Sequence, residues 1–190
     1  MITIRSGRWA ALLTALFVSG ALAQANGRTA ACAECHGADG NSVTAGKPSI
    51  AAQPRVFLEN YLVLTREGLR GSEEMQALLK DVPDNDIAAL AKHYSALPTR
   101  PDSGSIDKKL FEKGKEIASS YHCGSCHLPD FRGREQMPRL AGQREEFLAE
   151  AMLQYRQNRR PGGDTMMNAA LYGIPDEDFK ALAHYFSRLK

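Results

Sequence analysis

Apolar residues recur at every third or fourth position along two long stretches of the chain, residues 54–70 and 144–159. This spacing places them on one face of a helix, so both stretches are predicted to be amphipathic helices. Shorter helices, each with an acidic residue in its first turn, are predicted over residues 84–96, 107–121 and 176–189. No segment alternates apolar and polar residues for long enough to predict a sheet. The pattern therefore predicts an all-α fold.

The first 25 residues are a segment of a different kind. Arg5 and Arg8 precede an apolar run over residues 9–23, and small residues follow it. This order is typical of a secretory signal peptide, and we expect cleavage after Ala23 or Ala25. A membrane anchor is the competing interpretation, but the run of 15 residues is shorter than the roughly 20 that a spanning helix needs.

Removal of the signal changes the charge balance of the chain. The count of basic residues falls from 24 to 22, which equals the 22 acidic residues. A nearly neutral chain lacks the basic patch that nucleic-acid binding requires, so we predict no nucleic-acid partner. The composition, 43% hydrophobic and 24% charged, is that of a globular domain. Peripheral association with a membrane is left open by these observations.

All four cysteines lie in two copies of one pentapeptide, Cys-x-x-Cys-His. Cys32 and Cys35 precede His36, and Cys123 and Cys126 precede His127; this pattern is typical of covalent haem attachment. Two thiols three positions apart on a helical turn can reach the two vinyl groups of one porphyrin. The adjacent histidine is then placed to bind the iron from below. The sequence therefore predicts two covalently bound haem c groups.

Three other uses of paired cysteines compete with haem attachment: structural disulfides, a thioredoxin-like redox pair and a four-cysteine zinc site. A thioredoxin-like pair follows a strand, and the sequence predicts none. A zinc site gives no reason for a histidine after each pair, nor for a separation of 91 residues between the pairs. Haem attachment accounts for both features.

The second half of the chain repeats the first at an offset of 90 to 92 residues. Residues 48–53 (PSIAAQ) match residues 138–143 (PRLAGQ), and residues 82–91 match residues 174–183. Between the copies lies a segment rich in proline, serine and glycine, which is typical of a linker. The prediction is a first domain over residues 26–97, a linker over 98–106 and a second domain over 107–190.

The repeat also selects candidates for a second axial ligand to each iron. Methionine paired with histidine is the ligand set of cytochromes c and favours electron transfer over oxygen chemistry. Met75 lies eight residues before Pro83, and Met167 lies eight residues before Pro175, so the two methionines are equivalent. Met166 is the rival of Met167, although it aligns with a glutamate in the first copy. Met152, inside a predicted helix, is expected to be a core residue.

With these motifs, the chain resembles the two-haem class I cytochromes c, and the cytochrome c4 family in particular. The resemblance rests on both attachment motifs, the two proline-to-glutamine segments, the paired methionines and residues 37–42 (GADGNS). It implies two tandem class I cytochrome c domains, each a small helical bundle around a covalent haem. It also implies that Pro48 and Pro138 offer their carbonyl groups to His36 and His127; a simple turn proline is the alternative.

The resemblance further implies a periplasmic carrier, not itself an enzyme, that passes electrons singly to a terminal oxidase or reductase. The diheme cytochrome subunit of flavocytochrome c sulfide dehydrogenases is nearly as similar, notably in residues 40–43 (GNSV) and in a short segment before Cys32. In that alternative the protein is a subunit that accepts electrons from a flavoprotein. A haem peroxidase needs one haem without a methionine ligand, and the two candidate methionines argue against it.

Overall fold

The structure is a computed structural model, and it describes residues 28–101, 104–160, 162 and 165–190. The predicted signal peptide, residues 1–25, lies outside the described residues. Among the described residues, no helix combines the length and apolar character needed to cross a bilayer.

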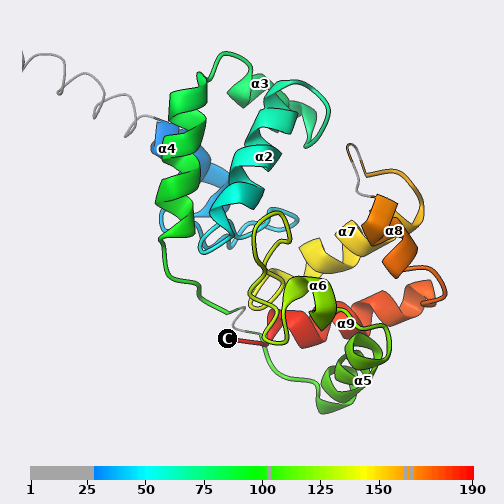
Figure 1. Cartoon of the computed structure of the whole chain (residues 1–190). Helices are drawn as coiled ribbons and strands as arrows, with labels where there is room; N and C mark the ends of the chain where they lie inside the picture. The colour runs from blue at the N-terminus through cyan, green and yellow to red at the C-terminus, as the bar shows by residue number, and fades with distance from the viewer. Residues whose placement is uncertain (1–27, 102–103, 161, 163–164) are drawn as a thin grey trace, which may run out of the picture.

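The described residues form helices joined by turns and loops, and only one isolated β-bridge, between Arg134 and Met137, is found among them. Figure 1 shows the helices in two groups, one in the upper left and one in the lower right of the view. The first group comprises residues 28–36, α2 (Arg55–Arg66), α3 (Glu73–Leu79) and α4 (Asp84–Ser95). The second comprises α5 (Lys108–Ser120), α6 (Gly124–His127), α7 (Glu145–Arg156), α8 (Thr165–Ala170), the 3-10 turn η1 (Asp176–Asp178) and α9 (Phe179–Ser187). The all-α prediction is confirmed.

The five predicted helices are all present, with shorter ends than the apolar pattern suggested. α2 stops at Arg66 rather than residue 70, because Gly68 adopts a φ of 72°, which glycine reaches without steric cost. The last predicted helix begins as the 3-10 turn η1 before continuing as α9. The short helices α3, α6 and α8 were not predicted, because four to seven residues are too few for a periodic pattern to show.

The buried apolar residues divide between the two groups of helices. In the second group a single cluster joins α5, α7 and α9, with Leu148, Phe179, Leu182 and Phe186 at its centre. The first group has two smaller clusters, one around Leu90 and one of Leu79, Val82 and Ile87. The described residues therefore form two domains, each with its own buried apolar residues.

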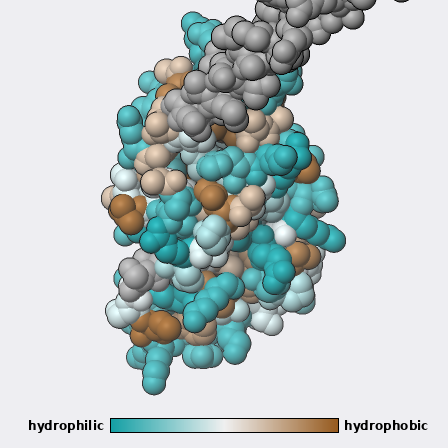
Figure 2. All heavy atoms as spheres, turned by 90° about the vertical axis from the view of Figure 1, so that its left-hand side faces the viewer, coloured by the Kyte–Doolittle hydropathy of each residue, from teal (hydrophilic) through white to brown (hydrophobic). Residues whose placement is uncertain are grey.

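The outer surface is mostly polar on the face drawn in Figure 2, where apolar side chains are scattered among hydrophilic ones. Single exposed apolar residues are ordinary in folded proteins. This face therefore offers no broad apolar patch.

In the second domain, α5 crosses α9 at Gly114. A Cβ atom at this position would lie 2.1 Å from the carbonyl oxygen of Ala181 and 2.7 Å from the Cβ of Tyr185. Glycine is required here because the two backbones approach too closely for any side chain.

We expect Gly114→Ala to destabilise the protein by about 2 to 3 kcal/mol, because α5 must move away from the core it covers. The measurement is chemical denaturation followed by far-ultraviolet circular dichroism. Lys115→Ala, at an exposed position of the same helix, is the control and should change stability by less than about 0.5 kcal/mol. Equal stability of the two variants would contradict the proposed close contact.

Candidate functional site

Both Cys-x-x-Cys-His segments are helical. The first lies in the helical residues 28–36, and the second consists of Cys123 followed by α6. All four cysteines are free thiols, and Cys126 is exposed. In the described part of the chain, no three histidine, cysteine or acidic residues gather into a metal-binding group. The cysteine pairs therefore form neither disulfides nor a joint zinc site in this structure.

The thiols of Cys32 and Cys123 are partly buried, and burial raises the pKa of each. In a thioredoxin-like pair, by contrast, the pKa of the reactive cysteine is lowered. Both cysteines lie against the apolar clusters of their domains. These surroundings suit a thioether bond, which carries no charge, better than a reactive thiolate.

The histidine of each motif is held by a proline carbonyl. Nδ1 of His36 lies 2.8 Å from the carbonyl oxygen of Pro48, and Nδ1 of His127 lies 2.8 Å from that of Pro138. A carbonyl oxygen can only accept, so Nδ1 carries the hydrogen and Nε2 is left with a free lone pair. Each ring is 6% exposed. This is the arrangement that orients a histidine as a metal ligand.

The protonation of these two rings also suits a ligand. Burial lowers the pKa of His36 and of His127, and the hydrogen bond to the proline carbonyl opposes this effect only in part. Both imidazoles are therefore neutral at neutral pH, as metal binding requires.

The two candidate methionines lie on the unpredicted short helices. Met75 is in α3, where its backbone N–H donates to the side chain of the N-cap residue Ser72, and it packs against the cluster of Leu79 and Val82. Met167 is in α8 and packs against the core of the second domain, whereas the neighbouring Met166 is 72% exposed. An exposed side chain is less suited to reach an iron within the domain. The structure thus favours Met167 over Met166, and ligation by both methionines stays a prediction.

Other candidates from the sequence have ordinary structural roles. Met152 is buried in the core of the second domain, as predicted. His93 is exposed. His184 is buried, its Nε2 accepts the backbone N–H of Asp107 at 3.0 Å, and its Nδ1 lies 3.0 Å from a carboxylate oxygen of Glu145. His184 therefore fastens the start of α5 to α7 and α9 and is engaged through both ring nitrogens.

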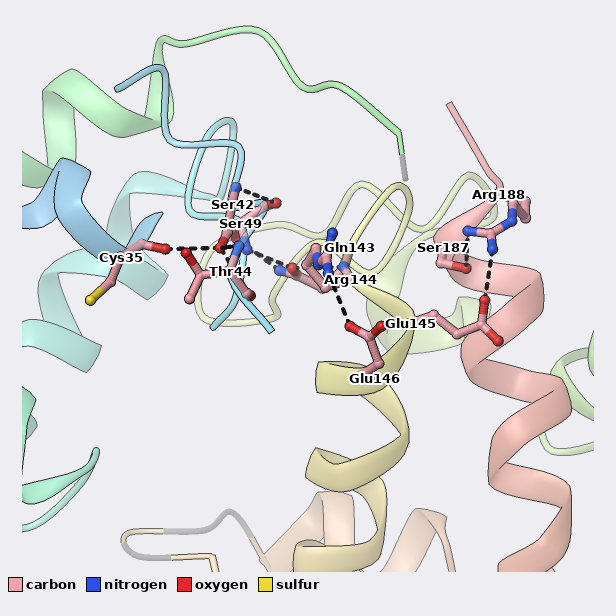
Figure 3. A network of polar contacts seen from close by, with 10 residues as sticks. All are labelled: Cys35, Ser42, Thr44, Ser49, Gln143, Arg144, Glu145, Glu146, Ser187 and Arg188. Carbon is pink, nitrogen blue, oxygen red and sulfur yellow. Dashed lines mark hydrogen bonds and ion pairs between the residues drawn. The ribbon is translucent and has the colours of Figure 1, made fainter. Parts of the chain in front are cut away.

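The two domains meet through the repeated proline-to-glutamine segments. The side-chain amide of Gln53 donates to the carbonyl oxygen of Arg139 at 3.0 Å, and its oxygen accepts the Arg139 N–H at 2.9 Å. Gln143 makes the same pair of bonds to the backbone of Ser49, at 2.8 and 2.7 Å. Figure 3 shows the contact between Ser49 and Gln143. Sequence reasoning identified both glutamines only as markers of the repeat; their identical spacing in the two copies was the available signal.

Arg139 is a buried cation in this interface. Its guanidinium group donates to the carbonyl oxygens of Ala51, at 2.9 Å, and of Ala141, while its Nε atom is buried without a partner. Burial lowers the pKa of Arg139 to about 10, so the group remains charged at neutral pH. Among the described residues no carboxylate pairs with it. A haem fits such surroundings, because its two propionate groups are anionic.

Comparison with known proteins agrees with these features. The family model for cytochrome c matches residues 111–190. The chain is 28% identical to cytochrome c4 of Azotobacter vinelandii over 90% of each protein. It is 28% identical to a thiosulfate dehydrogenase electron acceptor of Stutzerimonas stutzeri, over 87% of this chain and 82% of that protein. Cytochrome c-554(548) of Halomonas halodenitrificans is 34% identical over 34% of this chain and 81% of that protein.

Among solved structures, reduced recombinant cytochrome c4 from Pseudomonas stutzeri superimposes with a TM-score of 0.79 and 27% identity. The match covers 88% of this chain and 97% of that structure. Both domains therefore have counterparts in one known protein.

We expect Arg139→Met to destabilise the protein by about 2 to 4 kcal/mol, because two buried carbonyl groups lose a charged donor. Denaturant titration of the purified protein measures the change. Arg134→Met, which removes an exposed arginine of the same loop, is the matched control and should have an effect below about 0.5 kcal/mol. If Arg139→Met unfolded at the same denaturant concentration as the control, the bonds from Arg139 to the two carbonyl groups would not stabilise the protein.

Proposed function

Because this chain belongs to the cytochrome c family and matches cytochrome c4 along nine-tenths of its length, we propose that it is an exported carrier with two haems. It transfers electrons one at a time between redox proteins. The observation that carries this proposal is the occurrence, twice, of an attachment histidine whose Nδ1 is fixed by a proline carbonyl.

Each domain supplies the groups that one haem needs. Cys32 and Cys35 would hold the first haem through thioether bonds, and His36 and Met75 would ligate its iron. A bound haem supplies reversible one-electron chemistry at its iron. The histidine Nε2 lone pair, left free by the bond at Nδ1, and the methionine sulfur would be the two protein groups offered to the iron.

In the second domain, Cys123 and Cys126 would hold the haem, and His127 and Met167 would ligate its iron. Pro48 and Pro138 orient the two histidines. The haems are the missing part of each core, because domains of this size bury little apolar surface by themselves. The first domain extends over residues 26–97, and the linker 98–106 leads to the second domain at 107–190.

The place of action is the periplasm. Residues 1–25 direct export and are removed. The mature chain then contains no tryptophan, because Trp9 is the single one in the sequence.

The partners are redox proteins. A terminal oxidase or reductase suits a free carrier. A dedicated dehydrogenase is the second candidate, and the similarity to a thiosulfate dehydrogenase electron acceptor favours it. In that case, as in the flavocytochrome alternative, the protein is the electron-accepting subunit of an enzyme. Gentle purification from the native periplasm separates the cases, since a subunit retains a stoichiometric companion and a shuttle does not.

We expect the purified protein to carry the mass of two haems beyond that of the mature polypeptide, retained after denaturation. Intact-protein mass spectrometry with haem quantification measures this. The double variant Cys123→Ala, Cys126→Ala should retain one haem, held by the first domain. A mass equal to that of the amino acids alone would overturn the proposed function.

We expect Met167→Leu to remove the far-red sulfur-to-iron absorption of one ferric haem and to lower the reduction potential of that haem, because a thioether ligand raises it. Met166→Leu is the matched control, one residue away, and should leave both absorptions in place. The opposite outcome, a loss caused by Met166→Leu alone, would assign the ligand to Met166.

A further inference from the structure

The peptide group between Pro48 and Ser49 is hydrogen-bonded at both of its polar ends. Its carbonyl oxygen accepts from Nδ1 of His36 at 2.8 Å. Its N–H belongs to Ser49 and donates to the side-chain oxygen of Gln143, in the other domain, at 2.7 Å. A single peptide group therefore connects the histidine of the first domain to a glutamine of the second.

The same chain of bonds occurs in the opposite direction. The carbonyl oxygen of the Pro138–Arg139 peptide group accepts from Nδ1 of His127 at 2.8 Å, and its N–H donates to the oxygen of Gln53 at 2.9 Å. Each histidine is thus linked through one peptide group to the glutamine of the other domain. The repeat makes the two connections equivalent.

The glutamine ends of these connections are buried, and the histidine ends are partly buried. The two glutamines and the residues they bind are 3 to 4% exposed, and the two histidines are 6% exposed. Hydrogen bonds are stronger in such surroundings, and bonds on the same group strengthen one another. Water does not compete for the two buried amides, so removal of a glutamine weakens the bond that the same peptide group makes to the histidine.

The two bonds on each peptide group are cooperative. Donation by the N–H to glutamine shifts electron density toward the carbonyl oxygen and makes it a stronger acceptor. A stronger bond at Nδ1 increases the electron density that the imidazole can offer through Nε2. A more basic axial histidine favours the ferric over the ferrous iron and so lowers the reduction potential.

We propose that Gln143 lowers the reduction potential of the haem bound by His36, and that Gln53 lowers that of the haem bound by His127. This inference rests on the proposed function, since it requires a haem in each domain. The glutamines are positioning residues that act through a peptide group. Electron exchange with partner proteins remains one electron per site, and no proton leaves either histidine.

The proposal couples the potentials to the packing of the domains. Each glutamine reaches its target only while the two proline-to-glutamine segments remain in contact.

The test uses Gln53→Met and Gln143→Met in the two-haem protein, since methionine keeps the length of the side chain and removes its polar atoms. Hyperfine-shifted proton resonances distinguish the two haems during a redox titration. At a fixed electrode potential, we expect Gln53→Met to raise the ratio of reduced to oxidised haem about two- to threefold in the second domain. The first-domain haem should be unchanged, and Gln143→Met should give the reverse pattern, so each variant is the control of the other.

Gln53→Glu separates the proposed effect from a purely structural one. A carboxylate oxygen still accepts the Arg139 N–H, whereas the donation to the Arg139 carbonyl is lost. In Gln53→Glu, the ratio of reduced to oxidised haem in the second domain should equal that of the unmodified protein or fall below it. If Gln53→Glu behaved like Gln53→Met, the effect would come from altered packing and the proposal would be wrong.

A measurement on the unmodified protein does not depend on the folding of a variant. By thermodynamic reciprocity, a bond that favours the ferric state must itself be stronger in that state. The backbone amides of Ser49 and Arg139 should therefore exchange with deuterium more slowly in the fully oxidised protein than in the fully reduced one. Equal exchange rates in the two states would overturn the proposal.

The failures are distinguishable. A purified protein without covalent haem overturns both the function and this inference. Other results overturn only the inference and leave the proposed function standing. They are a protein with two titrating haems in which each glutamine variant changes the potential of the haem in the domain that contains that glutamine, changes both potentials equally, or changes neither.

Discussion

The hydrogen bond between each attachment histidine and a proline carbonyl is the constraint on which the remaining arrangement depends. It fixes the ring, leaves Nε2 free and determines where the chain after each proline must lie. That chain is the segment through which the domains meet, because Ser49 and Arg139 directly follow Pro48 and Pro138. The position of the metal ligand and the packing of the domains are therefore set by the same short segments.

The repeat produces a symmetric contact with different chemistry in its two halves. In the first domain, the Ser49 hydroxyl accepts the N–H of Ser42, whose own hydroxyl donates to the carbonyl oxygen of Cys35 (Figure 3). In the second domain, the equivalent position is the buried cation Arg139. A neutral hydroxyl and a buried positive charge therefore occupy equivalent positions of the two copies, so the contact is symmetric in its backbone but not in its charge.

The turn after each histidine shows how the second copy keeps the backbone of the first with a different residue. Gly37 has a φ of 83°, and a Cβ there would lie 2.6 Å from the carbonyl oxygen of Asn41. Leu128, at the equivalent position, has a φ of 70°, which is unfavourable for a residue with a side chain. The second copy lacks the glycine-rich turn, yet Leu128 keeps the positive φ of Gly37. With this backbone conformation, His127 still reaches the carbonyl oxygen of Pro138.

The sequence by itself determined the helical class, the duplication and the residues that attach a haem, because each is encoded by spacing along the chain: apolar periodicity, a 90- to 92-residue offset and Cys-x-x-Cys-His. It located the equivalent methionines but not the short helices that hold them. Only the tertiary structure decided that Met166 is exposed while Met167 packs inward, that Gln53 and Gln143 cross between domains, and that Arg139 is buried. The glutamine and arginine contacts join residues 86 to 94 positions apart, and Met167 packs against a core that three helices of its domain build together. Local spacing carries no information about which side chain such a contact will bury.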